Sequence, residues 1–160
     1  MKTPRVYIDT SVLGGYFERE FLVWSTALVE DFRAGRFVPV LSDLLAAEVE
    51  DAPARVRTLH AELLGLGAEN IRTDEEVLDL LEAYEQHRVL GPRYRQDMLH
   101  IALATVADVD VVVSWNYKHI VRSDKIRLFN AVNLAQGYKT LTIHTPREVT
   151  THGRERDQLG

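Results

Sequence analysis

The protein has 160 residues, and its 19 lysines and arginines stand against 24 aspartates and glutamates, so its formal net charge is -5. Apolar residues make up 46% of the chain, and no apolar run approaches the ~18 residues of a membrane-spanning helix. We therefore expect one soluble domain with no membrane segment and no secretory signal. The absence of cysteine excludes disulfides, thiolate zinc sites and a cysteine nucleophile, and it is in keeping with the cytoplasmic location that we expect.

The charges are unevenly distributed along the chain. Residues 1–90 carry a formal charge of -8, residues 91–127 carry +2, and residues 128–160 carry +1. The negative total argues against a nucleic-acid partner, whereas the basic excess of residues 91–127 leaves room for one.

The hydrophobic pattern predicts strands that alternate with helices, separated by short Gly, Pro and Asp/Ser breaks. The expected elements are strand 5–9 with a turn at Asp9-Thr10-Ser11, helix 20–34 stopped by Gly35, strand 37–41, helix 42–51 capped by Ser42, a helix from Pro53 to about 65, strand 68–72, helix 73–88 capped by Thr73, helix 96–106, strand 110–114, helix 123–136 capped by Ser123, strand 140–144 and a helical turn at Pro146. Such alternation predicts a three-layer α/β/α sandwich, Rossmann-like, around a central parallel sheet. We expect a single domain over residues 1–149 and a polar C-terminal tail over 150–160.

Polar residues cluster at the predicted carboxyl ends of the strands, where open parallel sheets bind their ligands. Asp9 ends the first strand, Ser114 and Asn116 end the strand at 110–114, and Asp97 begins the helix that leads into that strand. Glu48 lies on the helix that follows the second strand. Asp110 begins its strand and is therefore expected at the opposite edge.

Three carboxylates and one amide oxygen at one edge would repel one another unless a cation neutralised them. Oxygen ligands without Cys or a His pair favour Mg²⁺ or Mn²⁺ over Zn²⁺. Such an ion lowers the pKa of a bound water and polarises a phosphodiester.

The ordered motifs resemble those of the PIN-domain nucleases, particularly the VapC-like toxins of bacterial and archaeal toxin–antitoxin pairs. The matching segments are Val6-Tyr7-Ile8-Asp9-Thr10-Ser11, Glu48, residues 97–104, residues 114–120, Gly137-Tyr138 and residues 143–146. The resemblance implies a PIN-like fold and a Mg²⁺- or Mn²⁺-dependent endoribonuclease that hydrolyses single-stranded or structured RNA. It also implies a homodimer and a small antitoxin protein as partners.

By the same resemblance, Asp9, Glu48 and Asp97 match the three core acids. Asp9 and Asp97 would hold the ion, and Glu48 would complete the shell or orient the attacking water. Asn116 stands where many members have a fourth acid, so it keeps an oxygen ligand but loses one charge, and a strict two-metal mechanism is in doubt.

Several neighbours are candidate supporting residues. Thr10, Ser11 and Ser114 are hydroxyls beside the acids; for Thr10 and Ser11, hydrogen bonding to Asp9 or to a metal-bound water competes with simple turn formation. Lys118, His119 and Arg122 are candidate RNA-binding residues, against the alternative of a solvated basic face. His100 is expected to be a packed core histidine and is not assigned to catalysis.

Other roles stay open at this level. Trp115 and Tyr117 would stack on unpaired bases or, as we favour for Trp115, pack in the core. The second functional reading is a catalytically weakened PIN-like module that binds RNA or serves in assembly, and Asn116 is the residue that supports it. A phosphatase with an Asp nucleophile is set aside because it requires a second Asp two positions after Asp9, and position 11 is Ser.

Overall fold

The centre of the computed structural model, which describes residues 2–151, is a five-stranded sheet in the order β3-β2-β1-β4-β5. All four pairs of neighbouring strands are parallel. The strands are β1 (Arg5–Ile8), β2 (Val38–Ser42), β3 (Glu69–Ile71), β4 (Val111–Val113) and β5 (Ile143–His144). The chain builds the sheet outward from β1 through β2 to β3, and then returns to add β4 and β5 on the other side of β1.

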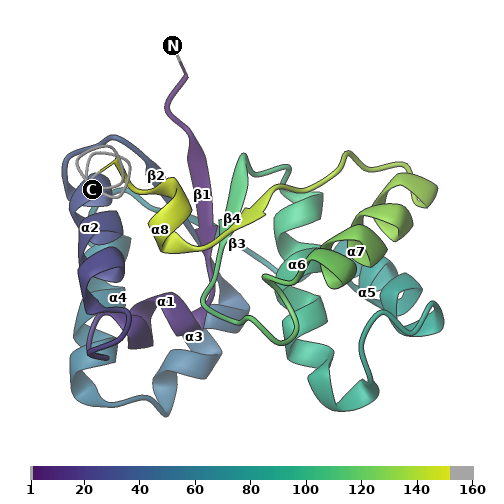
Figure 1. Ribbon diagram of the computed structural model, residues 1–160, viewed down its shortest axis with the longest axis horizontal. Coiled ribbons are helices and arrows are strands. Elements are labelled where there is room, and N and C mark those ends of the chain that lie inside the picture. Colours follow the sequence, from purple (N-terminus) through teal and green to yellow (C-terminus); the bar gives the residue numbers. More distant parts are fainter. Residues whose placement is uncertain (1, 152–160) are drawn as a thin grey trace.

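Helices cover both faces of this sheet (Figure 1). On one face lie α1 (Thr10–Gly15), α2 (Leu22–Arg33), α3 (Asp43–Glu50) and α4 (Ala54–Gly65), with α8 (Pro146–Val149) against α2. On the other face lie α5 (Glu75–Gln86), α6 (Arg95–Val106) and α7 (Ser123–Ala135), and the 3₁₀ turn η1 (Pro92–Tyr94) leads into α6. The predicted three-layer α/β/α sandwich with a central parallel sheet is therefore confirmed.

Alternation along the strands divides the apolar residues between two cores. In β1, Tyr7 belongs to the core beneath α5, α6 and α7, whereas Val6 and Ile8 belong to the core beneath α1 to α4. The same period of two separates Val112 from its neighbours in β4. A strand that is buried on both faces needs apolar residues at every position, which explains the uninterrupted valines of β4.

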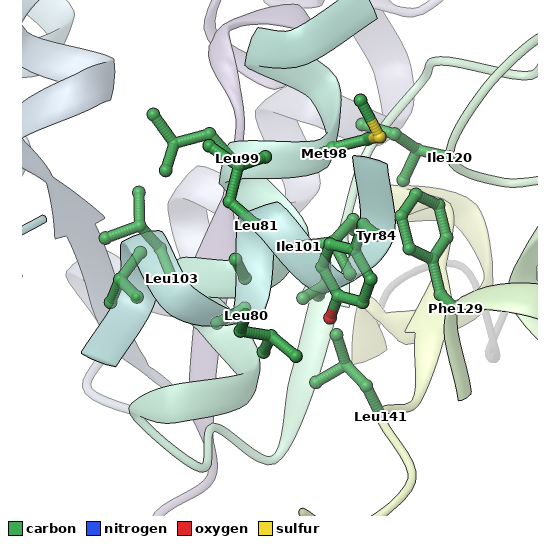
Figure 2. Packing of buried hydrophobic residues seen from close by; sticks show 14 of the residues in the cluster. Leu80, Leu81, Tyr84, Met98, Leu99, Ile101, Leu103, Ile120, Phe129 and Leu141 are labelled. Carbon is green, nitrogen blue, oxygen red and sulfur yellow. The ribbon is translucent and has the colours of Figure 1, made fainter. Parts of the chain in front are cut away.

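Packing around α6 fixes the helix that carries two of the polar residues discussed below. Figure 2 shows Met98, Leu99 and Ile101 of α6 among side chains from α5 and α7. The rings of Tyr84 and Phe129 meet edge to face at a centroid distance of 5.0 Å, and the buried Tyr84 hydroxyl donates to Asn133 Oδ1. Because every residue of α6 from Met98 to Thr105 is buried, the first turn of the helix has a defined position at the edge of the sheet.

Three helix starts differ from the sequence-based expectation. The segment after Asp9 is not a turn: helix α1 begins at Thr10, with Asp9 as its extended N-cap residue. Helix α5 is capped by Asp74, whose side chain accepts from Val77 N–H, while the Thr73 hydroxyl donates to Asp43. Ser123 is the first residue of α7, and the N-cap position is taken by Arg122. The cap predicted at Ser42 is confirmed by its bond from Leu45 N–H.

The end of the described chain is anchored on α2. The buried carboxylate of Asp31 accepts hydrogen bonds from the hydroxyls of Thr150 and Thr151, both at 2.7 Å, and from the Arg36 guanidinium at 3.0 Å. Thr150 and Thr151 thus pack against the domain, and the remainder of the expected tail, residues 152–160, lies outside the described residues. Among residues 2–151, no helix is both long and apolar enough to cross a membrane.

Candidate active site at the carboxyl edge of the sheet

The carboxylate of Asp9 lies where β1 and β4 end side by side. These two strands mark the point at which the strand order reverses, the usual binding position in open α/β sheets. Asp9 is 5% exposed, and each of its oxygens accepts a hydroxyl hydrogen bond, Oδ1 from Ser11 at 2.5 Å and Oδ2 from Ser114 at 2.6 Å. Residues 105 positions apart in the chain therefore meet at this acid.

Backbone N–H groups orient both hydroxyls toward Asp9. Trp115 N–H donates to Ser11 Oγ at 2.9 Å, and Asn116 N–H donates to Ser114 Oγ at 2.9 Å. A serine hydroxyl has a single proton, so a hydroxyl oxygen that accepts from the backbone still has that proton to give to the carboxylate. The segment after β4 thus fixes the orientation of an acid at the end of β1.

Burial raises the pKa of the Asp9 carboxyl above its ordinary value, because desolvation penalises the charged form. The attraction of His100 and the two serine hydroxyls lower this pKa, and the neighbouring charge of Glu48 raises it. The net shift is upward. The hydrogen-bond donors to this carboxylate are both hydroxyls, and among residues 2–151 it forms no ion pair with a lysine or an arginine.

Glu48 is held by two donors that both reach Oε1. Thr10 Oγ1 donates at 2.8 Å, and His100 Nε2 lies 2.6 Å away. On the other side of the imidazole, His100 Nδ1 lies 2.6 Å from the Tyr7 hydroxyl, which is itself 2.9 Å from Ser42 Oγ. A chain of hydrogen bonds therefore runs from the buried end of β2 through β1 to the half-buried carboxylate on α3.

The direction of the hydrogen bond between His100 and Glu48 follows from which atoms can donate a proton and which can only accept one. An ionised Glu48 has only acceptor oxygens, so His100 donates from Nε2. The Tyr7 hydroxyl donates to Nδ1 when the imidazole is neutral and accepts from Nδ1–H when it is charged, the form whose attraction acts on Asp9 and Glu48. Burial alone would raise the pKa of Glu48, but the hydrogen bond and attraction from His100, with the Thr10 bond, lower it overall.

Asp97 lies in the first turn of α6, one turn before His100. Its Oδ2 is 3.1 Å from His119 Nδ1, and His119 belongs to the segment between β4 and α7. The predicted location of Asp97 at the carboxyl edge of β4 therefore agrees with its contact. The Asp97 carboxylate pairs with His119, whereas Asp9 and Glu48 are bound by other side chains.

The Asn116 side chain stabilises the turn after β4. Its Oδ1 accepts from His119 N–H at 3.0 Å, while its carbonyl accepts from the N–H groups of Ile120 and Val121. This use of the amide oxygen is an ordinary Asx turn. One lone pair of Oδ1 is left for a further partner.

The donor chemistry at this edge fits a hard divalent cation, since the side chains offer carboxylate, amide and hydroxyl oxygens without thiolate. A buried carboxylate with a raised pKa and a second acid beside it is an environment that such an ion would stabilise. Within residues 2–151, however, no three His, Asp or Glu side chains are gathered closely enough to hold one ion. Asp9 and Glu48 are electrostatic neighbours, and Asp97 is held separately by His119.

The aromatic residues after β4 differ in exposure. Trp115 is 7% exposed; its ring stacks on Phe21 at 4.4 Å, and its Nε1–H donates to Ser25 Oγ at 2.8 Å. These contacts agree with the core packing that we favoured for Trp115, and they leave neither face of its ring for a base. Tyr117, by contrast, is 54% exposed. Lys118 is exposed, Arg122 pairs with Asp124 at 2.7 Å, and His119 is engaged by Asp97.

The sequence did not indicate the hydrogen-bond chain from Ser42 through Tyr7 and His100 to Glu48. The expectation of a core histidine is right about burial, as His100 is 2% exposed, but both ring nitrogens are bound within the site. Asp97 and His100 are three residues apart and share a helix face, and this spacing was the sequence feature that placed His100 near an acid. It did not identify Glu48 as the partner.

Comparisons with known proteins agree with the fold. No family model matches the chain, and no curated protein sequence matches it. Among solved structures, the "Crystal Structure of FitAcB from Neisseria gonorrhoeae" is similar, with a TM-score of 0.56 and 15% sequence identity, over 88% of this chain and 97% of that chain. At this identity the likeness shows a shared fold.

Proposed function

We propose that the protein is a Mg²⁺- or Mn²⁺-dependent endoribonuclease of the PIN-domain type, serving as the toxin of a toxin–antitoxin pair. The observation that supports this most is the buried, hydroxyl-bonded Asp9 at the reversal point of the sheet, with Glu48 as its charged neighbour. The ordered motifs that resemble the VapC-like toxins, and the fold shared with the FitAcB structure, point the same way.

In this proposal Asp9, Asp97 and Asn116 hold the ion. When bound, the ion supplies charge stabilisation at the scissile phosphate and acidifies a water. The remaining roles belong to the chain itself. Ser11 and Ser114 orient Asp9, while Thr10 and His100 hold Glu48 by Oε1, which leaves Oε2 to accept a proton from a water.

The proposed partners follow from the same resemblance. RNA phosphates would meet Lys118, His119 and Arg122, which lie in the segment between β4 and α7. A small antitoxin would cover the acidic edge, and a second copy of the chain would complete a homodimer. We place the proposed activity in the cytoplasm.

Mn²⁺-dependent cleavage of RNA tests the proposal directly. The purified protein is expected to cleave a labelled RNA with Mn²⁺ and not with excess EDTA, and Asp9→Asn and Asp97→Asn to lower the rate at least about 100-fold. Asp110→Asn is the matched control, since this acid binds Arg5 N–H at the opposite edge of the sheet. Undiminished cleavage in both site variants would overturn the site assignment.

A second candidate function is a catalytically weakened module that binds RNA or serves in assembly. It is favoured by the Asn116 oxygen being used in a turn and by the lack of a three-residue metal group in residues 2–151. Calorimetric titration with Mn²⁺ separates the two, because the nuclease requires divalent binding that Asp9→Asn removes, whereas the weakened module shows no such binding.

A further inference from the structure

A basic pocket of about 470 Å³ opens beside the Asp97–His119 pair. Its walls come from η1, from the segment after β4 and from the first turn of α7. The side chains that matter here are Tyr94, Lys118, His119, Arg122 and Lys125. Because His119 both lines the pocket and contacts Asp97, the pocket adjoins one acid of the proposed active site.

Three cationic side chains of the pocket have N–H groups left to bind an anion. Lys118 is exposed and has no partner among the described residues. Lys125 Nζ uses one N–H on the Val89 carbonyl at 3.0 Å and keeps two. Arg122 bonds Asp124 through Nε, so its terminal N–H groups remain for a ligand.

The pocket also offers a flat aromatic surface. The Tyr94 and His119 rings lie at a centroid distance of 3.8 Å with an interplanar angle of 34°. This pairing braces Tyr94, which is nevertheless 36% exposed and lines the pocket. A ring beside a group of cations matches a nucleotide, whose base stacks while its phosphate is bound by Lys and Arg.

We propose that this pocket is a subsite for one unpaired nucleotide of the RNA, with Lys118, Arg122 and Lys125 on its phosphate and Tyr94 under its base. The proposal rests on the proposed ribonuclease function and specifies its substrate, because a base in a duplex is already stacked and is not free to meet Tyr94. An acidic peptide would satisfy the cations and would have no use for the ring. The pocket therefore favours RNA over a peptide.

Binding without cleavage is the decisive measurement. A fluorescein-labelled single-stranded RNA of about 12 nucleotides is titrated in EDTA and followed by anisotropy. The double variant Lys118→Ala/Arg122→Ala is expected to weaken binding more than tenfold and to reduce the slope of log K against log salt by about 0.7 for each phosphate that the protein no longer neutralises. Arg127→Ala, which removes the charge of an exposed arginine of α7 outside the pocket, is the control for the loss of a positive charge elsewhere and is expected to change Kd less than twofold.

The aromatic half of the subsite has its own test. Tyr94→Ala is expected to weaken binding about 5- to 150-fold, whereas Tyr94→Phe retains the ring and binds like the wild type. The same strand annealed into a duplex should bind at least tenfold more weakly. Equal weakening by Arg127→Ala, equal affinity for the duplex, or equally tight binding of a polyglutamate peptide through the same lysine and arginine would each overturn the subsite.

Different results would contradict the proposed subsite and the proposed nuclease activity. If the wild type cleaves RNA with Mn²⁺ and the pocket variants bind and cleave equally well, the subsite is wrong and the nuclease stands. If RNA binding depends on the pocket but the wild type does not cleave, the subsite stands and the protein is the weakened module.

Discussion

His100 Nε2 lies 2.6 Å from Glu48 Oε1, so a histidine from the middle of α6 holds an acid on α3. The Tyr7 hydroxyl occupies the other ring nitrogen at 2.6 Å, and the imidazole is almost completely buried. An imidazole bound at both nitrogens cannot rotate without breaking a bond. In the proposed function His100 is therefore a positioning residue, on which the orientation of the Glu48 carboxylate depends.

Removing this bond is expected to impair turnover more than RNA binding. His100→Ala should lower kcat about 10- to 100-fold with KM changed less than threefold, as for groups that orient a site acid. His100→Gln places an amide N–H near the position of Nε2 and should recover most of the rate. Steady-state kinetics, with thermal unfolding of each variant as the control for folding, measure the difference. Equal losses in folded His100→Gln and His100→Ala would contradict the positioning role.

Asp9→Asn is expected to stabilise the metal-free protein at neutral pH while abolishing cleavage. The raised pKa of Asp9 means that the folded state binds a proton more tightly than the unfolded state, so this group removes stability as pH rises through its folded pKa. Asparagine carries no charge to desolvate. Urea unfolding in EDTA should show a higher free energy of unfolding for Asp9→Asn than for the wild type, and this difference should shrink as the pH falls through the folded pKa of Asp9.

A bound divalent ion should make the wild type more stable than Asp9→Asn. Mn²⁺ at about 100 times its Kd would stabilise the wild type by about 2.7 kcal/mol and leave Asp9→Asn unchanged. A gain from Mn²⁺ of the same size in both proteins would show that the ion binds elsewhere.

Gly15 leaves no room for a side chain. A Cβ at this position would lie 2.7 Å from Trp115 Nε1 and 2.8 Å from Ser25 Oγ, two atoms that are hydrogen-bonded to each other in the core. Gly15→Ala should therefore destabilise the fold by about 1–3 kcal/mol in urea unfolding. Gly14→Ala is the neighbouring control, since its Cβ would meet nothing closer than Glu18 Oε1 at 3.6 Å, and it should be neutral or stabilising by up to about 1 kcal/mol. Similar losses in both variants would refute the steric explanation.

The anchor between Asp31 and the C-terminal segment can be weakened without changing side-chain shape. Thr150→Val removes a hydroxyl that donates to the buried Asp31 carboxylate at 2.7 Å, and it should cost about 1.5–3 kcal/mol, the usual range for a hydrogen bond to a charged group. Thr140→Val, at an exposed position, is expected to change the free energy of unfolding by less than about 0.5 kcal/mol. Equal effects would mean that the Thr150 bond adds no stability.

The sequence was sufficient for the architecture because strand and helix periods are local properties. The valines of β4 and the N-cap at Ser42 could be predicted from neighbouring residues alone. Helix α1 was missed because Asp-Thr-Ser is typical of turns and two glycines follow shortly after. Its start is favoured by tertiary packing, with Val12 and Leu13 fully buried.

Pairing within the site depends on tertiary structure that no local pattern encodes. The sequence indicated the acids, but the bond between Glu48 and His100 joins residues 52 positions apart. Likewise, the contact between His119 and Asp97 joins two separate elements, and no local pattern predicted it, while the RNA-binding role of His119 stays a prediction. Whether Asp9, Asp97 and Asn116 share an ion stays a prediction.

The central place of β1 in the sheet has a consequence for synthesis on the ribosome. Asp9 is made 105 residues before Ser114, whose hydroxyl binds its Oδ2. A nascent chain that stops short of β4 lacks one flank of β1 and cannot complete the surroundings of this acid. Asp9 therefore acquires its full hydrogen-bonded environment only after β4 has been made and has joined the sheet.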